Sequence, residues 1–423
     1  MAAIMSDSED TNSIDESIVC KAFESLSQSC HRTSSTVPEY DDRRPTISRD
    51  RIAVLSSLLI EMRTTLLPSL QQRLDELVVL LDAPNFPKDP QTNLRASLEI
   101  TSQLADILER IGSTIRTVTL ARLKNFEIQD HSHGIAKSHR TEPLLEKVGM
   151  LIRDYLCRLF DRHLEFLQGW KRPKEEEGDR RFKSRSVSEE TALSSEMIDE
   201  AIQLLTKSDF NLIQDNWEIT VTHHYEKGLA SLIEHIIMNQ SDQARNPADD
   251  KKLSDPHASR APATNKQVDL TLLRSALPFV KLGRLFFNRL LITPISRPSM
   301  AIESLICSFY LDGVNNKTYM FSHQMGIFTQ RLVELSESNS LRHPQSARIL
   351  KKEFHETLQY FDTSIELLAR HLVPQALVHT YPRQYPRSQT LFNDCFSLLI
   401  DQFRLAAQNF SMALERFFQI NKN

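Results

Sequence analysis

Hydrophobic residues recur every three or four positions along most of this 423-residue chain, from Ser48 to Phe417. This spacing places them on one face of an α-helix, whereas strand-like alternation is confined to residues 218–222. The many phenylalanines and a period near 3.6 favour globular packing over an extended coiled coil. We therefore predict an all-α protein, a multi-helix bundle whose helices pack through their apolar faces.

Polar and proline-containing stretches divide the first half of the chain into separate helices. Pro68 interrupts the first apolar run and is expected to kink or split that helix, because proline lacks a backbone donor and clashes with the preceding turn. Residues 127–142 predict a polar loop. Residues 171–191, which are almost entirely charged, predict a solvated loop.

Residues 241–266 contain Leu253 as their only large aliphatic side chain and predict a flexible linker. The linker separates an N-terminal helical bundle, residues 48–240, from a C-terminal helical bundle, residues 267–420. These two halves pack either separately or as one continuous bundle. Residues 1–47 are acidic and serine-rich, and we predict them to be mostly disordered. They include one short amphipathic segment, formed by Ile14, Ile18, Phe23 and Leu26.

Glycine is scarce, with nine residues in the chain, well below the ~7 % that is average for proteins. Left-handed turns and phosphate-binding loops depend on glycine, so its scarcity argues against a functional site built from loops. The sequence also lacks the common phosphate-binding, dinucleotide-binding, serine-hydrolase and zinc-protease motifs. We expect no enzymatic activity and no cofactor, with function carried by helix surfaces.

Charge and cysteine content narrow the cellular setting. The net charge of −4 gives no bias toward nucleic acid or an anionic membrane. Five cysteines without metal-site spacing favour a reducing compartment. The N-terminal sequence lacks a signal-peptide pattern, and no stretch of ~18 uninterrupted apolar residues is present. We expect a cytoplasmic or nuclear protein that does not span a membrane.

The sharpest match to a catalytic motif lies at Asn393, Ser397 and Asp401. These residues resemble the NDxxSxxxE magnesium motif of class I terpene synthases, with Asp in place of Glu, and an acidic pair lies upstream at Asp249 and Asp250. Oxygen ligands at i, i+4 and i+8 of one helix suit Mg²⁺. At about 100° per residue, however, they point away from the apolar stripe of their helix. We interpret them as a solvated face, with a terpene-synthase-like enzyme as the alternative.

Histidines are the remaining candidates for metal ligands. Those of the 127–142 loop match no structural zinc spacing, and adjacent histidines face different sides of a helix. We interpret the following as ordinary polar residues: Asp130, His131, His133, His139, His223, His224 and Glu226. His163 and His371 lie at the edges of apolar stripes and are interpreted as histidines at the boundary of the core.

Four serines have the surroundings of phosphorylation sites. Ser184 and Ser188 follow basic residues, whereas Ser6 and Ser8 are flanked by acidic residues. A phosphate adds about −1.5 to −2 charges and recruits arginine clusters. The alternatives for the basic segment are a solvated run of charges, nuclear import and contact with RNA.

The segment 276–290, ALPFVKLGRLFFNRL, alternates apolar and basic residues between long helices. Together with those helices it resembles uncharacterised all-helical families of plant-parasitic fungi, which are distantly similar to the Grap2 and cyclin-D-interacting protein family. That resemblance implies a helical bundle that binds other proteins and carries no catalytic residues.

We therefore expect a non-enzymatic interaction or adaptor protein with protein partners. A second alternative is a helical protein that binds a membrane surface through the basic and aromatic residues of the same segment. These residues are Lys281, Arg284, Phe286, Phe287 and Arg289.

Overall fold

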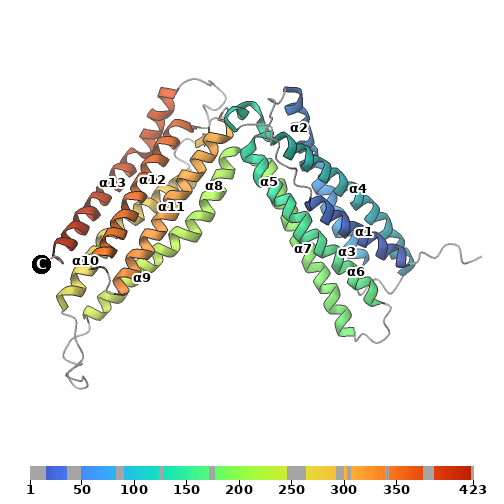
Figure 1. Ribbon diagram of the computed structural model, residues 1–423, viewed down its shortest axis with the longest axis horizontal. Coiled ribbons are helices and arrows are strands. Elements are labelled where there is room, and N and C mark those ends of the chain that lie inside the picture. Colours follow the sequence, from blue (N-terminus) through green and yellow to red (C-terminus); the bar gives the residue numbers. More distant parts are fainter. Residues whose placement is uncertain are drawn as a thin grey trace, which may run out of the picture. The chain divides into compact units, whose positions relative to one another are not determined.

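In the computed structural model, nearly all described residues are helical, and the all-α class predicted from periodicity is confirmed. The described residues are 16–35, 49–81, 90–122, 127–170, 177–244, 263–291, 300–302, 306–338, 341, 343–374 and 385–420. The chain forms two compact units, Met1–Lys207 and Ser208–Asn423 (Figure 1). Each unit has its own hydrophobic core.

Unit 1 is a bundle of long helices around a core of leucine, isoleucine and phenylalanine. Helix α1 packs on α4 and α6, α3 packs on α4 and α7, and α7 packs on α5 and α6, so the helices close a ring around the core. The helices are α1 (Glu16–Ser35), α2 (Arg49–Glu61), α3 (Leu67–Leu80), α4 (Pro90–Arg122), α5 (Ser138–Met150), α6 (Cys157–Trp170) and α7 (Glu177–Thr206).

Short turns of other helical types connect these helices. A π-helical turn, η1 (Met62–Leu66), joins α2 to α3, and a second, η5 (Leu151–Leu156), joins α5 to α6. Pro68 follows η1 in the first turn of α3, where a missing backbone donor costs little. The backbone stays helical from η1 into α3, with Leu66 and Leu67 both in the right-handed helical region, so Pro68 follows a π-helical turn and not a break in the helix. The 3₁₀ turns η3 (Glu127–Ser132) and η4 (Gly134–Ala136) precede α5.

Unit 2 is a second closed bundle, with a core rich in leucine and phenylalanine. Helices α9 and α10 pack together, α10 packs on α13, α13 on α12, α12 on α11, and α11 on α8 and α9. The elements are α8 (Asp209–Thr220), the π-helical turn η6 (Val221–Tyr225), α9 (Glu226–Ala244), α10 (Ala263–Leu291), α11 (Ser308–Glu337), α12 (Pro344–His371) and α13 (Tyr385–Ile420). A short antiparallel ladder, β1 (Met300–Ile302) with β2 (Leu372–Pro374), pairs Ala301 with Val373.

Most of the buried phenylalanines of unit 2 form one aromatic network. The ring of Phe279 lies 4.8 Å from Phe403 and 5.4 Å from Phe354 between centroids, and the rings of Phe361 and Phe403 stack at 3.9 Å. The polar tips of the largest buried aromatic residues also find partners. Trp217 donates from Nε1 to Oγ1 of Thr318 at 2.5 Å. The core therefore combines aromatic packing with satisfied polar groups.

The N-terminal segment corrects one prediction. Residues 16–35 form α1, which contributes Val19, Phe23, Leu26 and Cys30 to the core of unit 1, although residues 1–47 were predicted to be mostly disordered. These four residues lie at i, i+4, i+7 and i+11, but the serines and glutamates between them dilute the pattern. Ile18, assigned to the amphipathic face, is exposed, and Ile14 lies outside the described residues.

The charged segment corrects a second prediction. Residues 177–191 begin helix α7 and are not part of a loop, whereas residues 171–176 lie outside the described part. The inward face of α7 uses Val187, Thr191 and Ser194, all buried. Thr191 and Ser194 satisfy their hydroxyls on backbone carbonyls one turn earlier, at 2.9 and 2.8 Å. Because buried threonine and serine side chains count as polar in the sequence, the pattern does not show that this face of α7 is buried.

The division between the units lies at Lys207 and Ser208 rather than at residues 241–266. Helices α8 and α9, assigned to the N-terminal half, carry Trp217 and Tyr225 into the core of unit 2. Helix α9 reaches Ala244 and packs on α10, which begins at Ala263. Residues 245–262, which contain Asp249 and Asp250, lie outside the described residues.

Candidate functional site

The three candidate magnesium ligands lie on α13 with exposed side chains: Asn393, Ser397 and Asp401. This agrees with their predicted position away from the apolar stripe. Across the described residues, no group of three or more His, Cys, Asp or Glu side chains is arranged to hold a metal ion. The structure therefore brings no second carboxylate cluster to this face of α13 within its described part.

The histidine-rich segment of unit 1 forms the turns η3 and η4 and the start of α5, rather than a polar loop to residue 142. Asp130 is buried and accepts a hydrogen bond from the backbone N–H of Ser138 at 2.8 Å. It thereby satisfies a free donor in the first turn of α5. His131 is exposed and His139 is buried. Burial lowers the pKa of His133 despite the neighbouring Asp130 carboxylate.

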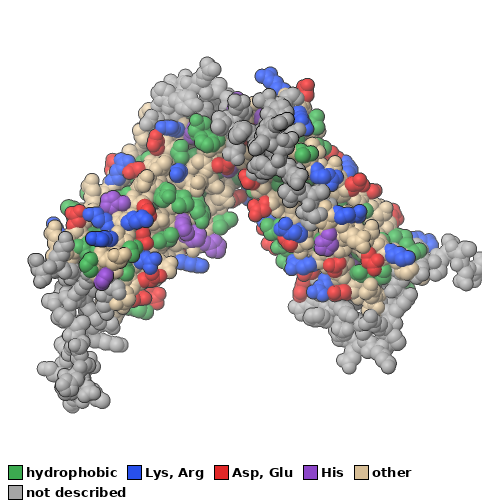
Figure 2. Space-filling model, viewed as in Figure 1, with side chains coloured by type: hydrophobic (Ala, Val, Ile, Leu, Met, Phe, Trp, Pro, Cys, Tyr) green, Lys and Arg blue, Asp and Glu red, His purple; other side chains and the backbone are tan. Residues whose placement is uncertain are grey.

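The adjacent histidines of η6 separate as predicted, and His223 is exposed. The ring of His224 lies 5.0 Å from that of His323 and 6.2 Å from that of Tyr319, both on α11. Burial lowers the pKa of His224, and the neighbouring His323 lowers it further. In the view of Figure 2, histidine and hydrophobic side chains lie close together on the surface of unit 2. Glu226 pairs with Arg284 of α10 at 2.5 Å.

Two other histidines lie deeper than the sequence predicted. His163 is fully buried, stacks on Phe23 at 5.2 Å and bonds through Nδ1 to the carbonyl of Leu159 at 2.8 Å. Burial lowers its pKa to about 4. His371 is also buried, beside the ring of Tyr310 at 5.2 Å. Both are core residues and not boundary residues.

The candidate phosphorylation sites fall partly outside the described chain. Ser6 and Ser8 lie outside it, and Ser184 falls within α7 with a side chain that the structure does not describe. Ser188 is exposed on the same helix. The basic segment around Ser184 thus belongs to a helix where the sequence predicted a loop.

The aromatic residues on which the membrane-binding alternative depends are not on the surface. Phe286 and Phe287 are buried in the core of unit 2, so they do not share an exposed face with the basic residues of α10. Within the described chain, one helical stretch, Arg49–Leu80, is long and apolar enough to cross a membrane by length and composition alone. Its inward residues belong to the core of unit 1, and 28 % of its most apolar window is buried there.

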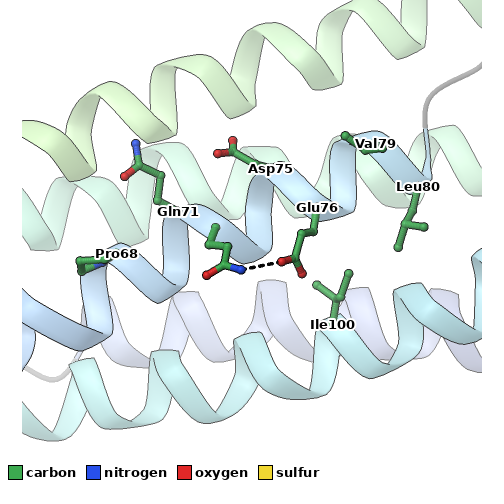
Figure 3. Close-up of a pocket in the computed structure, with 8 residues that line it drawn as sticks. Pro68, Gln71, Asp75, Glu76, Val79, Leu80 and Ile100 are labelled. Carbon is green, nitrogen blue, oxygen red and sulfur yellow. Dashed lines mark hydrogen bonds between the residues drawn. The ribbon is translucent and has the colours of Figure 1, made fainter.

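An open groove of about 670 Å³ follows α3 on the surface of unit 1 (Figure 3). Helix α3 supplies most of its lining, and α4 supplies one residue. The lining residues are Pro68, Gln71, Gln72, Asp75, Glu76, Val79, Leu80 and Ile100. The π-helical turn η1 lies directly before this part of α3. Turns of this type are frequent at functional sites.

The apolar part of the groove lies at the C-terminal end of α3. Val79 has 65 % of its side chain exposed, a high value for a large apolar residue, and it lies near Leu80 and Ile100. Leu77 and Leu81 face the core on either side of it. The helical period therefore turns Val79 toward solvent within an otherwise apolar run.

The polar part of the groove is acidic. Glu76 accepts a hydrogen bond from Gln72 at 2.8 Å and pairs with Arg73, and these contacts lower its pKa (Figure 3). Asp75 lies on the other side, where partial burial raises its pKa and the nearby Asp199 carboxylate raises it further. A cation placed between Asp75 and Asp199 would relieve this repulsion.

Two other grooves differ in character. The groove between α1 and α4, of about 770 Å³, is lined by charges of both signs, including Arg32, Arg116 and Glu109. The groove between α12 and α13 is smaller, about 200 Å³, and Lys351 and Glu415 face each other across it at 3.9 Å. The α3 groove alone among these three combines an apolar end with charges of mainly one sign.

The α3 groove was not predicted from the sequence. A signal was nevertheless present, because the five consecutive apolar residues 77–81 exceed what one helical face can bury.

Two family models match the chain. A domain of unknown function (DUF8723) covers residues 56–206, and a second domain of unknown function (DUF8721) covers residues 208–412. Their junction coincides with the division between the two structural units. No curated protein and no solved structure matches the chain.

Proposed function

We propose that this protein is a non-enzymatic interaction protein and that the α3 groove binds an amphipathic helix of a partner protein. The partner helix carries basic residues beside apolar ones. The observation behind this proposal is the exposed Val79 next to the carboxylates of Asp75 and Glu76 in the lining, with Asp199 of α7 close enough to Asp75 to raise its pKa. Apolar anchors and complementary charge are the features by which grooves recognise amphipathic helices.

The dimensions of the groove suit such a ligand. From Pro68 to Leu80 the helix rises about 18 Å, which is the length of roughly three helical turns. A bound helix of this length offers apolar anchors at i, i+3 or i+4, and i+7. Its basic side chains would reach the carboxylates of Asp75 and Asp199.

The lining favours binding over catalysis. Among the described residues, the lining holds no histidine, cysteine, serine or lysine, so they offer no nucleophile paired with a base. The resemblance of residues 276–290 to interaction proteins points in the same direction. Partners in the cytoplasm or nucleus remain our expectation.

Selection of a phage-displayed library of helical peptides on the full chain tests this proposal. We expect the enriched peptides to combine leucine-type anchors with lysine or arginine at helical spacing. The substitutions Val79→Arg and Asp75→Lys should each weaken binding of these peptides at least about tenfold, because they place positive charge in the groove.

Leu193→Arg is the matched control, since Leu193 is exposed on α7 outside the lining of the groove. It should leave peptide binding unchanged. Enrichment of acidic or uncharged peptides, or equal binding by the Val79→Arg variant, would refute the proposal.

A further inference from the structure

Helix α13 exposes a straight row of apolar residues that its bundle does not use. Leu398, Leu405 and Met412 recur every seven residues, with 70 %, 57 % and 50 % of their side chains exposed. At 3.6 residues per turn, positions seven apart deviate by about 20°, so the three side chains lie on one line. The inward stripe of α13, which includes Phe403 and Phe410, packs on unit 2 and is separate from this row.

Opposite charges lie at the two ends of the same line. Asp394 lies eleven residues before Leu405 and Arg416 lies eleven residues after it, each within about 20° of the row. Both side chains are exposed, and no ion pair joins either of them within the described part of the chain. Along the helix axis, the exposed side chains are therefore first acidic, then apolar and finally basic. The distance from Asp394 to Arg416 along the axis is about 33 Å.

We propose that two copies of the chain associate through this row, with their α13 helices antiparallel and a two-fold axis at Leu405. In this arrangement Leu405 of one copy contacts Leu405 of the other. Leu398 contacts Met412 and Asp394 pairs with Arg416, and symmetry repeats each of these two contacts. A two-fold interface requires such self-complementarity, in which each residue's partner is repeated by symmetry.

Charge excludes the parallel alternative. Parallel helices would place Asp394 against Asp394 and Arg416 against Arg416, which is repulsive at both ends. In the antiparallel pair the flanking positions are compatible, since Asp401 lies opposite Asn409 and Gln402 opposite Gln408. The exposed face around Asn393, Ser397 and Asp401 thus borders a contact between copies.

The contact is narrow, with one helix from each copy, so it forms a weak and reversible dimer rather than an obligate one. Sedimentation equilibrium of the full chain tests the proposal. Between about 1 and 100 μM, we expect the average mass to rise from 48.7 kDa toward twice that value. A constant monomer mass across this range would overturn the proposal.

Substitutions locate the contact. Leu405→Glu brings two carboxylates together at the axis and should raise the dimer Kd at least about tenfold. Because Leu405 is exposed, the far-ultraviolet circular dichroism of this variant should not change. Ile237→Glu, at an equally exposed residue of α9, is the control and should leave the dimer intact.

Charge reversal separates the two orientations. Asp394→Arg and Arg416→Asp should each weaken an antiparallel dimer, and the double variant should restore it to within about twofold. Disulfide cross-linking gives a second test. When the Leu398→Cys and Met412→Cys variants are mixed, a chain of one variant should cross-link to a chain of the other. Cross-linking of Leu398→Cys only with itself would indicate parallel helices and overturn the proposal.

Discussion

At the scale of single residues, position 283 requires glycine because the hydroxyl of Tyr225 occupies the space that a Cβ would need. Tyr225 is buried and donates to the carbonyl of Val280 at 2.6 Å. A Cβ at Gly283 would lie 2.1 Å from the Tyr225 hydroxyl, well inside the contact distance of any two heavy atoms. The close approach of α10 to η6 therefore depends on a residue without a side chain.

We predict that Gly283→Ala lowers the free energy of unfolding by about 2–4 kcal/mol, because Tyr225 must move and lose its hydrogen bond. Tyr225→Phe removes the clashing hydroxyl, so the double variant should be more stable than Gly283→Ala alone. Urea denaturation followed by circular dichroism measures both. Gly149→Ala is the control, since a Cβ there meets no atom within 4 Å, and it should be neutral or stabilising. If the free energy of unfolding of Gly283→Ala changed as little as that of Gly149→Ala, this explanation of Gly283 would be contradicted.

His163 makes the stability of unit 1 depend on pH. Its pKa in the folded protein is about 4, against an ordinary value of 6.5, because burial disfavours the charged ring. A depressed pKa means that the folded state holds the neutral form. The contribution of His163 to the free energy of unfolding is complete above pH 6.5 and is lost as the pH falls toward 4. The difference corresponds to about 3 kcal/mol.

We expect His163→Gln to show a shallower decline in the free energy of unfolding between pH 6.5 and 4 than the wild type. Urea denaturation of both proteins at several pH values gives the two slopes. The comparison of slopes is informative even if the variant is less stable at every pH. Parallel slopes would exclude His163 as the titrating group.

At the scale of helices, α1 belongs to the fold because one stripe of its side chains completes the core of unit 1. Phe23 is fully buried, with its ring 6.4 Å from Phe160 and stacked on His163. Cys157 of α6 also approaches the carbonyl of Ser27, at 3.9 Å. Helix α1 is therefore held in unit 1 by its packing against α6 and α4.

We predict that Phe23→Ala weakens the docking of α1 by about 3–5 kcal/mol. Hydrogen exchange of residues 16–35 should become faster than in the wild type, and proteases should cleave this segment sooner. Ile18→Ala, at a side chain that is 48 % exposed, should change neither measurement. Unchanged protection of α1 in the Phe23→Ala variant would show that other contacts hold the helix.

The helices were predictable because their apolar stripes are long, but their joins were not. At the π-helical turns, neighbouring residues are buried together, as with Leu66 and Leu67, and with Thr220 and Val221. One extra residue per turn moves the stripe around the helix, so a fixed period of 3.6 loses it there. The charged start of α7 escaped detection for a different reason, because Thr191 and Ser194 are buried in place of apolar residues.

At the scale of the whole molecule, the boundary between the units lies where the sequence carries no linker signal. Only Lys207 and Ser208 separate α7 from α8. Ser208 caps α8 by accepting from the N–H of Asn211 at 3.1 Å, and Arg140 of α5 donates to the carbonyls of Leu204 in α7 and of Lys207 directly after it. Residues 241–266, which look like a linker, connect two helices of one unit.

The five consecutive apolar residues 77–81 indicate that α3 exposes an apolar side chain, but which side chain is exposed, and beside which charges, could not be predicted from sequence alone. Val79, Leu398 and Leu405 are apolar residues in apolar helices, and periodicity assigns one inward stripe to each helix. Only the packed structure shows that these side chains remain outside the stripe. The row on α13 also depends on the position of its charged ends relative to the exposed residues.

The central claim is that the α3 groove is a binding surface for a partner helix. Photo-cross-linking in cells, with a benzophenone amino acid in place of Val79, tests it most directly. The account predicts a covalent product whose partner peptide is helical and rich in lysine or arginine, and no such product when the same amino acid replaces Leu193. Absence of a partner product at position 79, or the same product at both positions, would contradict it.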